Sequence, residues 1–140
     1  TCLVFRLCVH HYHRYAYPDN GRKTKNTFIP GVLHTVRPVA LRELPVFTEN
    51  AREYTVLRSE NFGDGLQMEV GAMLVGKIDN YHQEADVRRG QEKGRFLYGG
   101  STIILLLEPG TAAVTEKFFE ATRAGEETEV KMGEAIGRRG

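Results

Sequence analysis

A run of five apolar residues at positions 103–107 limits what the surrounding chain can form, because glycine and proline frame it on both sides. Gly99-Gly100 lies before the run, and Pro109-Gly110 lies after it. A bounded apolar run of this length is too short for a stable helix and is typical of a buried strand. We expect this strand to open at Ser101 and to be the most buried strand of the protein.

Further strands are predicted at several places along the chain. Apolar and polar residues alternate over residues 2–9, and this period of two is typical of a half-buried strand. Residues 53–57 predict another strand. Residues 66–78 predict a strand pair rather than a helix, because Gly71 and Gly76 interrupt an apolar stretch.

The remaining segments are predicted to form turns, connectors and one short helix. Pro18-Asp19-Asn20-Gly21 is a strong turn signal. The other expected segments are a looped or edge segment at 28–39, a turn at 61–65, a solvated connector at 87–95, a short helix at 114–122 with Phe118 and Phe119 facing inward, and a strand-turn-strand at 130–137. Short strands at near-regular spacing predict a mainly β fold, a sandwich or barrel-sandwich-like domain with few short helices.

Length, charge and cysteine content exclude several classes of protein. A chain of 140 residues suits one domain with its own core. Lys and Arg number 19 and Asp and Glu 18, and this balance disfavours a nucleic-acid partner but leaves a membrane surface open. Cys2 and Cys8 have no second pair to form a zinc site or a disulfide framework. The first residue is Thr1 rather than Met, and we expect a processed chain or a piece of a longer one.

The Gly100-Ser101 step favours a particular reaction. Glycine lacks a Cβ atom, so the hydroxyl group of the next residue can approach its carbonyl carbon closely. An N→O acyl shift requires that geometry, and such a shift is the first step in converting an internal serine into a pyruvoyl group. Serine is a weak nucleophile until a base takes its proton. Taken alone, the motif has a simpler interpretation as a turn that leads into a core strand.

Three histidines after the first strand are candidates for that base. If the strand continues, His11 and His13 share one face, while His10 lies on the other. Their ordinary pKa near neutrality suits acid–base chemistry. A metal site is disfavoured, because no Cys, Asp or Glu residues accompany them at ligand spacing. Polar residues at a strand end are the structural alternative, and no carboxylate has a motif context that marks it as a partner of the base.

Taken together, these motifs resemble the phosphatidylserine decarboxylase family. Gly99-Gly100-Ser101-Thr102 resembles the family's self-processing signature, in the branch with glycine in place of the more common leucine before Gly-Ser-Thr. The other matching segments, in chain order, are His10-His11-Tyr12-His13-Arg14-Tyr15 with Pro18 and Asn20-Gly21, Pro30-Gly31, His34-Thr35-Val36-Arg37-Pro38, residues 45–53, residues 70–76 and residues 93–98. The ordered set covers nearly the whole chain and is far more specific than Gly-Ser-Thr alone.

The resemblance implies self-cleavage between Gly100 and Ser101 by the acyl shift, followed by β-elimination and hydrolysis. A covalent pyruvoyl group, the cofactor, would then replace Ser101. The single catalytic domain, residues 1–140, would divide into a β portion at 1–100 and an α portion at 101–140. His13 matches the family histidine that acts as base in self-cleavage, and His10 matches the one assigned to decarboxylation. No metal is implied, and the family's upstream triad aspartate and N-terminal membrane-binding elements have no match in these 140 residues.

The implied activity is pyruvoyl-dependent decarboxylation of phosphatidylserine to phosphatidylethanolamine. The expected partners are the phospholipid substrate, a membrane surface and the chain's own α and β portions, without nucleic acid, and a homodimer is compatible with the resemblance. The expected location is peripheral, on the cytoplasmic face of a bacterial cell membrane. Two alternatives stay open: a pyruvoyl decarboxylase of the same family that acts on a soluble amino acid or another phospholipid, and a non-catalytic β-sandwich binding module. A serine hydrolase is disfavoured, because Ser101 is not in a Gly-x-Ser-x-Gly motif.

Overall fold

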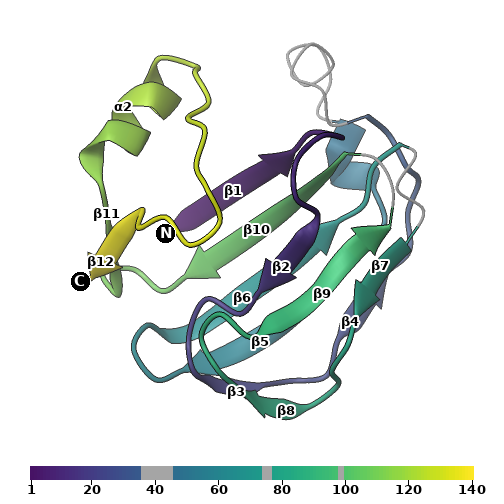
Figure 1. Cartoon of the computed structure of the whole chain (residues 1–140), viewed down its shortest axis with the longest axis horizontal. Helices are drawn as coiled ribbons and strands as arrows, with labels where there is room; N and C mark the ends of the chain where they lie inside the picture. Colours follow the sequence, from purple (N-terminus) through teal and green to yellow (C-terminus); the bar gives the residue numbers. More distant parts are fainter. Residues whose placement is uncertain (36–45, 74–76, 98–99) are drawn as a thin grey trace.

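The larger sheet of the computed structural model, which describes residues 1–35, 46–73, 77–97 and 100–140, has seven antiparallel strands (Figure 1). The strand order is β1-β10-β6-β5-β3-β8, and β4 also pairs with β5. The bounds are β1 (Cys2–Leu7), β3 (Gly21–Lys23), β4 (Thr27–Ile29), β5 (Arg52–Ser59), β6 (Gly63–Val70), β8 (Ala85–Val87) and β10 (Ser101–Leu107). Strand β10 lies between β1 and β6, so both of its edges are hydrogen-bonded.

A second antiparallel sheet packs against one face of the larger sheet (Figure 1). Its strands, in spatial order, are β2 (Arg14–Ala16), β9 (Glu92–Leu97) and β7 (Lys77–Asn80). Tyr15 and Phe96 from this sheet form an apolar cluster with Leu7 and Ile103 of the larger sheet. The mainly β prediction is therefore confirmed, with the two sheets as the layers that enclose the core.

The C-terminal segment forms a small unit beside β1 (Figure 1). Strands β11 (Ala112–Val114) and β12 (Gly137–Arg139) pair, and helix α2 (Glu116–Arg123) lies between them in the chain. An ion pair between Arg6 and Glu127 joins this unit to β1. A short 3-10 helix, η1 (Val46–Glu49), precedes β5. None of the described helices is long and apolar enough to cross a membrane.

The predicted turns at 18–21 and 61–65 meet in the structure. Strands β5 and β6 form a hairpin in which Ser59 pairs with Gly63, leaving a three-residue loop. Gly63 has a φ of +68°, in the left-handed region that favours glycine in such loops. The Asp19 carboxylate accepts hydrogen bonds from the Asn61 backbone, at 2.9 Å, and from the Ser59 hydroxyl. The β2–β3 turn is thereby tied to the β5–β6 hairpin.

Strand β10 is less buried than its composition predicts, and this expectation was wrong. Ser101 and Thr102 are buried, but residues 103–107 are only partly buried and Leu106 is 42% exposed. The reason is that successive side chains of a strand point to opposite faces, and only one face of β10 contacts the second sheet. Ile103 lies on that inner face, against Tyr15 and Phe96.

Four other sequence expectations are corrected. Residues 87–95 are not a solvated connector, because they include the end of β8 and most of β9, in which Lys93 is fully buried. Helix α2 has no buried residue, and Phe119 is 42% exposed rather than inward. The strand-turn-strand at 130–137 is absent from the described C-terminal segment, where β12 pairs with β11 instead. Strands β6 and β7, predicted as a pair, belong to different sheets.

Other expectations are confirmed. Strands β1, β5 and β6 form where alternation or apolar stretches predicted them. The predicted edge segment at 28–39 is confirmed at its start. Strand β4 lies there, and among the described strands it pairs with β5 alone. Residues 36–39 of that segment, Gly76 of the predicted strand pair and Gly99 before Ser101 lie outside the described residues.

The apolar contact of Leu57 with Tyr17 and Val87 generates a stability prediction. Leu57 is 4% exposed, so Leu57→Ala removes buried methyl groups and leaves a cavity. We expect the free energy of unfolding to fall by about 2–5 kcal/mol, measured by urea denaturation. Val4→Ala is the control, because Val4 is 60% exposed and should change little. Equal losses in the two variants would contradict the assignment of Leu57 to the core.

Candidate active site

Ser101 is the first residue of β10 and directly follows Gly100. Its Cα atom lies opposite that of Leu7 on β1, and Thr102 lies opposite Val70 on β6. The Ser101 side chain is fully buried, and within the described parts of the chain nothing hydrogen-bonds its Oγ atom. Buried hydroxyl groups normally have a partner, because an unpaired one costs about 1–3 kcal/mol. The predicted nucleophile is thus held in place by the backbone while its hydroxyl group stays unengaged.

His13 lies in the connection from β1 to β2 and is oriented by its own neighbourhood. Its Nδ1 atom donates to the backbone oxygen of His11 at 2.7 Å, and its ring meets the Phe96 ring edge-on, with centroids 6.5 Å apart. Because Nδ1 is the donor, the neutral ring carries its free lone pair on Nε2. That Nε2 atom is buried and has no hydrogen-bond partner among the described residues. In a neutral His13 ring with this hydrogen bond, the acceptor atom is therefore the buried Nε2.

His13 and Ser101 border the same apolar cluster from two directions. His13 contacts it through Phe96, whose backbone N–H also donates to the His13 carbonyl at 2.9 Å. Ser101 borders it through Leu7, its partner across β1, and Ile103, its neighbour on the same face of β10. The fold thus brings the two predicted residues to one region, although 88 positions separate them in the chain.

His10 and His11 do not continue the first strand, which ends at Leu7. The two rings pack edge-on with centroids 4.4 Å apart, and His11 Nδ1 accepts a hydrogen bond from the Cys8 backbone at 3.1 Å. His10 is exposed. The expected sharing of strand faces by these histidines therefore does not occur. Among the residues that the structure describes, no group of three His, Cys, Asp or Glu side chains is placed to hold a metal ion.

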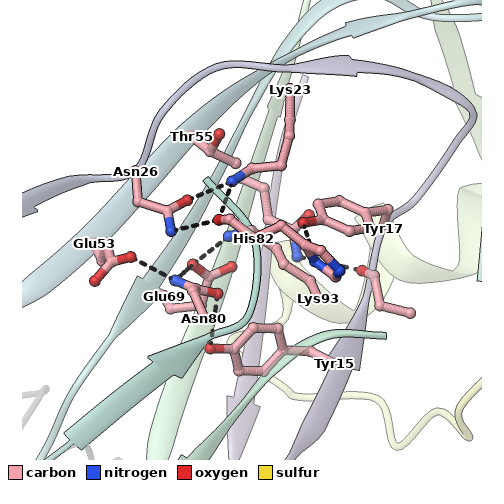
Figure 2. A network of polar contacts seen from close by, with 12 residues as sticks. Tyr15, Tyr17, Lys23, Asn26, Glu53, Thr55, Glu69, Asn80, His82 and Lys93 are labelled. Atoms are coloured by element: carbon pink, nitrogen blue, oxygen red, sulfur yellow. Dashed lines mark hydrogen bonds and ion pairs between the residues drawn. The ribbon is translucent and has the colours of Figure 1, made fainter. Parts of the chain in front are cut away.

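An ion pair between Lys93 and Glu69 crosses the space between the two sheets, and both side chains are fully buried (Figure 2). Lys93 Nζ lies 2.5 Å from Glu69 Oε2. Asn80 Nδ2 donates to the same oxygen at 3.2 Å and to Glu53 Oε1 at 2.9 Å. The Tyr15 hydroxyl donates to Asn80 Oδ1 at 3.2 Å. The network thus connects β5 and β6 of the larger sheet to all three strands of the smaller one.

A second buried lysine, Lys23, lies in the same network (Figure 2). Its Nζ atom donates to the side chain of Asn26 and to the backbone oxygens of His82 and Gln83, each at 2.7 Å. Burial, and secondarily the charge of Lys93, lower the pKa of Lys23 to about 8. The interior between the sheets therefore holds polar and charged side chains beside its apolar clusters.

Burial acts in opposite directions on the two partners of the ion pair. It raises the pKa of Glu69 and lowers the pKa of Lys93, while their mutual attraction opposes both shifts. Sequence reasoning singled out neither residue. Lys93 lies in the segment predicted as a solvated connector, and Glu69 lies in a stretch noted only for apolar residues and glycines. No local motif marks them, because only the pairing of distant strands brings them together.

Comparison with known proteins defines the class of this chain. A family model described as phosphatidylserine decarboxylase matches residues 1–138. The chain is 49% identical over 137 residues to "Phosphatidylserine decarboxylase proenzyme 2" of Clostridium acetobutylicum, covering 98% of this chain and 47% of that protein. It is 43% identical over 141 residues to the phosphatidylserine decarboxylase proenzyme of Clostridium tetani, covering 99% of this chain and 48% of that protein.

The chain therefore belongs to the phosphatidylserine decarboxylase family, as the sequence motifs predicted. It spans about half the length of the curated relatives that it matches. No solved structure matches it. Some residues of the segments that carried the resemblance lie outside the described part of the chain. These are residues 36–38, 45, 74–76, 98 and 99.

The buried ion pair generates a second stability prediction. Lys93→Ala leaves the Glu69 carboxylate buried without its cation, and we expect the free energy of unfolding to fall by about 3–5 kcal/mol. Urea denaturation at neutral pH measures the effect. Arg22→Ala is the control, because the ion pairs of Arg22 with Glu84 and Asp86 are exposed and should contribute little. Similar losses of unfolding free energy in both variants would mean that burial does not determine how much an ion pair contributes to stability.

Proposed function

We propose that this chain carries the self-cleaving, catalytic portion of a pyruvoyl-dependent phosphatidylserine decarboxylase, which converts phosphatidylserine to phosphatidylethanolamine. The observation that supports this most directly is the buried, unpaired Oγ atom of Ser101 immediately after Gly100. The relatives are named proenzymes, and that name fits a precursor whose nucleophile is already in place. The orphaned hydroxyl group also fits residue 101 as the source of the pyruvoyl group.

In the proposed self-cleavage, the Oγ atom of Ser101 attacks the carbonyl carbon of Gly100. The new C–O bond forms as the C–N bond between the two residues breaks, and the Ser101 nitrogen receives the proton that leaves Oγ. β-Elimination of the resulting ester then removes the Cα proton and breaks the Cβ–Oγ bond, releasing the Gly100 carboxylate. Addition of water and loss of ammonia complete the conversion of residue 101. The chain is thereby divided into residues 1–100 and 101–140.

His13 is the proposed base for the Oγ proton. The hydrogen bond from its Nδ1 atom to the His11 carbonyl leaves the Nε2 lone pair free to accept that proton. The buried position of Nε2 keeps water from competing for it. A positioned base of this kind contributes about 10²–10⁴-fold to a proton-transfer step.

In the proposed decarboxylation, the pyruvoyl group supplies an electron sink for the carbanion that forms when CO₂ is lost. His10 is assigned to this later step, and its exposed ring beside His11 is accessible to an incoming headgroup. A phospholipid substrate implies work at a membrane surface, with peripheral attachment at the cytoplasmic face of a bacterial membrane. The two chain portions would stay associated, because β10 is paired with β1 and β6 on either side.

The first test replaces the nucleophile in the natural full-length polypeptide. We expect Ser101→Ala to abolish both chain cleavage and decarboxylation of phosphatidylserine, because no hydroxyl group remains to attack Gly100. Intact mass spectrometry, with and without borohydride and an amine, measures both cleavage and the reactive carbonyl. Wild-type protein should give two fragments that meet between Gly100 and Ser101, with only the C-terminal one trapped. A cleaved and active Ser101→Ala protein would refute the pyruvoyl assignment.

The second test separates the two histidines. We expect His13→Ala to block cleavage, and His10→Ala to cleave normally but to decarboxylate phosphatidylserine slowly. His34→Ala is the control, because the His34 ring lies 3.5 Å from the carboxylate of Glu49, a side chain that is 70% exposed. Cleavage is followed by intact mass and decarboxylation by release of CO₂. The opposite pattern, with cleavage lost only in His10→Ala, would mean that the two roles are exchanged.

A further inference from the structure

The proposed self-cleavage has two proton-abstraction steps, and His13 is proposed as the base of the first only. His13 accounts for the proton that leaves Oγ in the acyl shift. The β-elimination then removes the Cα proton of residue 101, which needs a base at the same place but in a later step. The C–H bond is a far weaker acid than the hydroxyl group, so a positioned base is needed more in this step than in the first.

Glu69 lies next to residue 101 on the inner face of the larger sheet. It pairs with Ile103 across β6 and β10, and Ser101 is two residues before Ile103. Residues two apart on a strand share a face, so Ser101 and Glu69 are diagonal neighbours. Such neighbours are about 7–8 Å apart, within reach of a long side chain. Figure 2 shows the Glu69 carboxylate in the space between the sheets, with Lys93 and Asn80 around it.

Glu69 uses only one of its two carboxylate oxygens. Lys93 and Asn80 both donate to Oε2, whereas Oε1 is buried and has no hydrogen-bond partner in the described part of the chain. Across the described residues, four buried side-chain atoms are unpaired in this way, and they are His13 Nε2, Gln67 Oε1, Glu69 Oε1 and Ser101 Oγ. Two of the four belong to ionisable groups. These two groups are the candidates for the two proton-abstraction steps of the reaction.

A purely structural role explains this arrangement less well. A buried ion pair is often no more stabilising than apolar side chains of the same size, because both charges lose their hydration. The unpaired Oε1 atom adds a further cost. Burial also raises the pKa of Glu69, against the opposing effect of Lys93, and a carboxylate with a raised pKa is a stronger base.

We propose that Glu69 is the general base of the β-elimination and removes the Cα proton of residue 101 through its free Oε1 atom. This inference rests on the proposed function. The electron pair of the Cα–H bond forms the Cα–Cβ double bond, the Cβ–Oγ bond breaks, and the Gly100 carboxylate leaves. Lys93 is a positioning residue, because its bond to Oε2 fixes the carboxylate and directs Oε1 away from the pair.

The experiment uses the double variant Glu69→Gln/Lys93→Met in the natural full-length polypeptide. Removing both charges together avoids a buried, unpaired ion, and cooperative thermal unfolding confirms that the variant folds. We expect the acyl shift to proceed and the elimination to slow by about 100-fold. The ester has the same mass as the uncut chain, but hydroxylamine cleaves it between Gly100 and Ser101. Intact mass before and after hydroxylamine therefore measures the trapped ester.

Two results would overturn the proposal. One is formation of the trappable carbonyl at the wild-type rate, which would make the ion pair structural only. The other is a folded, uncut double variant that resists hydroxylamine, which would place Glu69 before the ester. If the double variant does not fold, Glu69→Asp decides between the same outcomes, because it keeps the charge but withdraws the carboxylate by one methylene group. A wild-type protein that never cleaves would refute the proposed function instead.

A matched control uses another ion pair of β9. Arg95 Nε lies 3.0 Å from Asp79 Oδ2, and both side chains are partly exposed. Asp79→Asn/Arg95→Met removes two charges from β7 and β9 without changing the inner face. We expect this variant to cleave at the wild-type rate and to accumulate no ester. Ester accumulation in the control as well would show a general effect of β9 charges and overturn the assignment to Glu69.

Discussion

The pairing of β10 with strands on both sides is the constraint on which the rest of the structure depends. Six residues pair with β1 and six with β6, so neighbouring strands hold β10 along its length on both sides. Ser101 is consequently placed without help from its own side chain, whose hydroxyl group stays free. A shift of one residue would send Ser101 to the opposite face, away from the second sheet. The backbone therefore does the positioning that a hydrogen bond to Oγ would otherwise do.

The polar interior follows from the same register. Because Ile103 pairs with Glu69, the inner face that carries Ser101 also carries a carboxylate, and Lys93 from the second sheet neutralises it. Lys23 and its three acceptors extend the polar region along the same face. Apolar packing between the sheets is thus divided into two clusters, around Tyr15 with Phe96 and around Tyr17 with Leu57. The charged groups near Ser101 therefore take up part of the space that a continuous apolar core would otherwise fill.

Local patterns predicted several of the strands, but neither β9 nor the composition of the inner face. The strand that opens at Ser101 was predictable because glycine, serine and an apolar run each act over a few residues. The depth of Glu69 was not, because alternation along β6 would by itself bury Leu66 and Met68 and expose Gln67 and Glu69. The structure has the reverse arrangement, with Gln67 and Glu69 buried and the two apolar residues only partly buried. The difference arises from long-range pairing with β10 and from the Lys93 counter-charge, neither of which is visible in a window of neighbouring residues.

The unpaired buried atoms connect the energetics of the fold to its chemistry. Each costs about 1–3 kcal/mol, so the four among the described residues are a substantial loss, since domains are typically stable by only about 5–15 kcal/mol. A sequence selected for stability alone would pair them or replace them with apolar side chains. A precursor that converts its own serine cannot do so, because a hydroxyl group engaged elsewhere is a poorer nucleophile and an engaged nitrogen or oxygen is a poorer base. In the proposed self-cleavage, the unpaired atoms of His13, Glu69 and Ser101 serve a single reaction, after which residue 101 is no longer a serine.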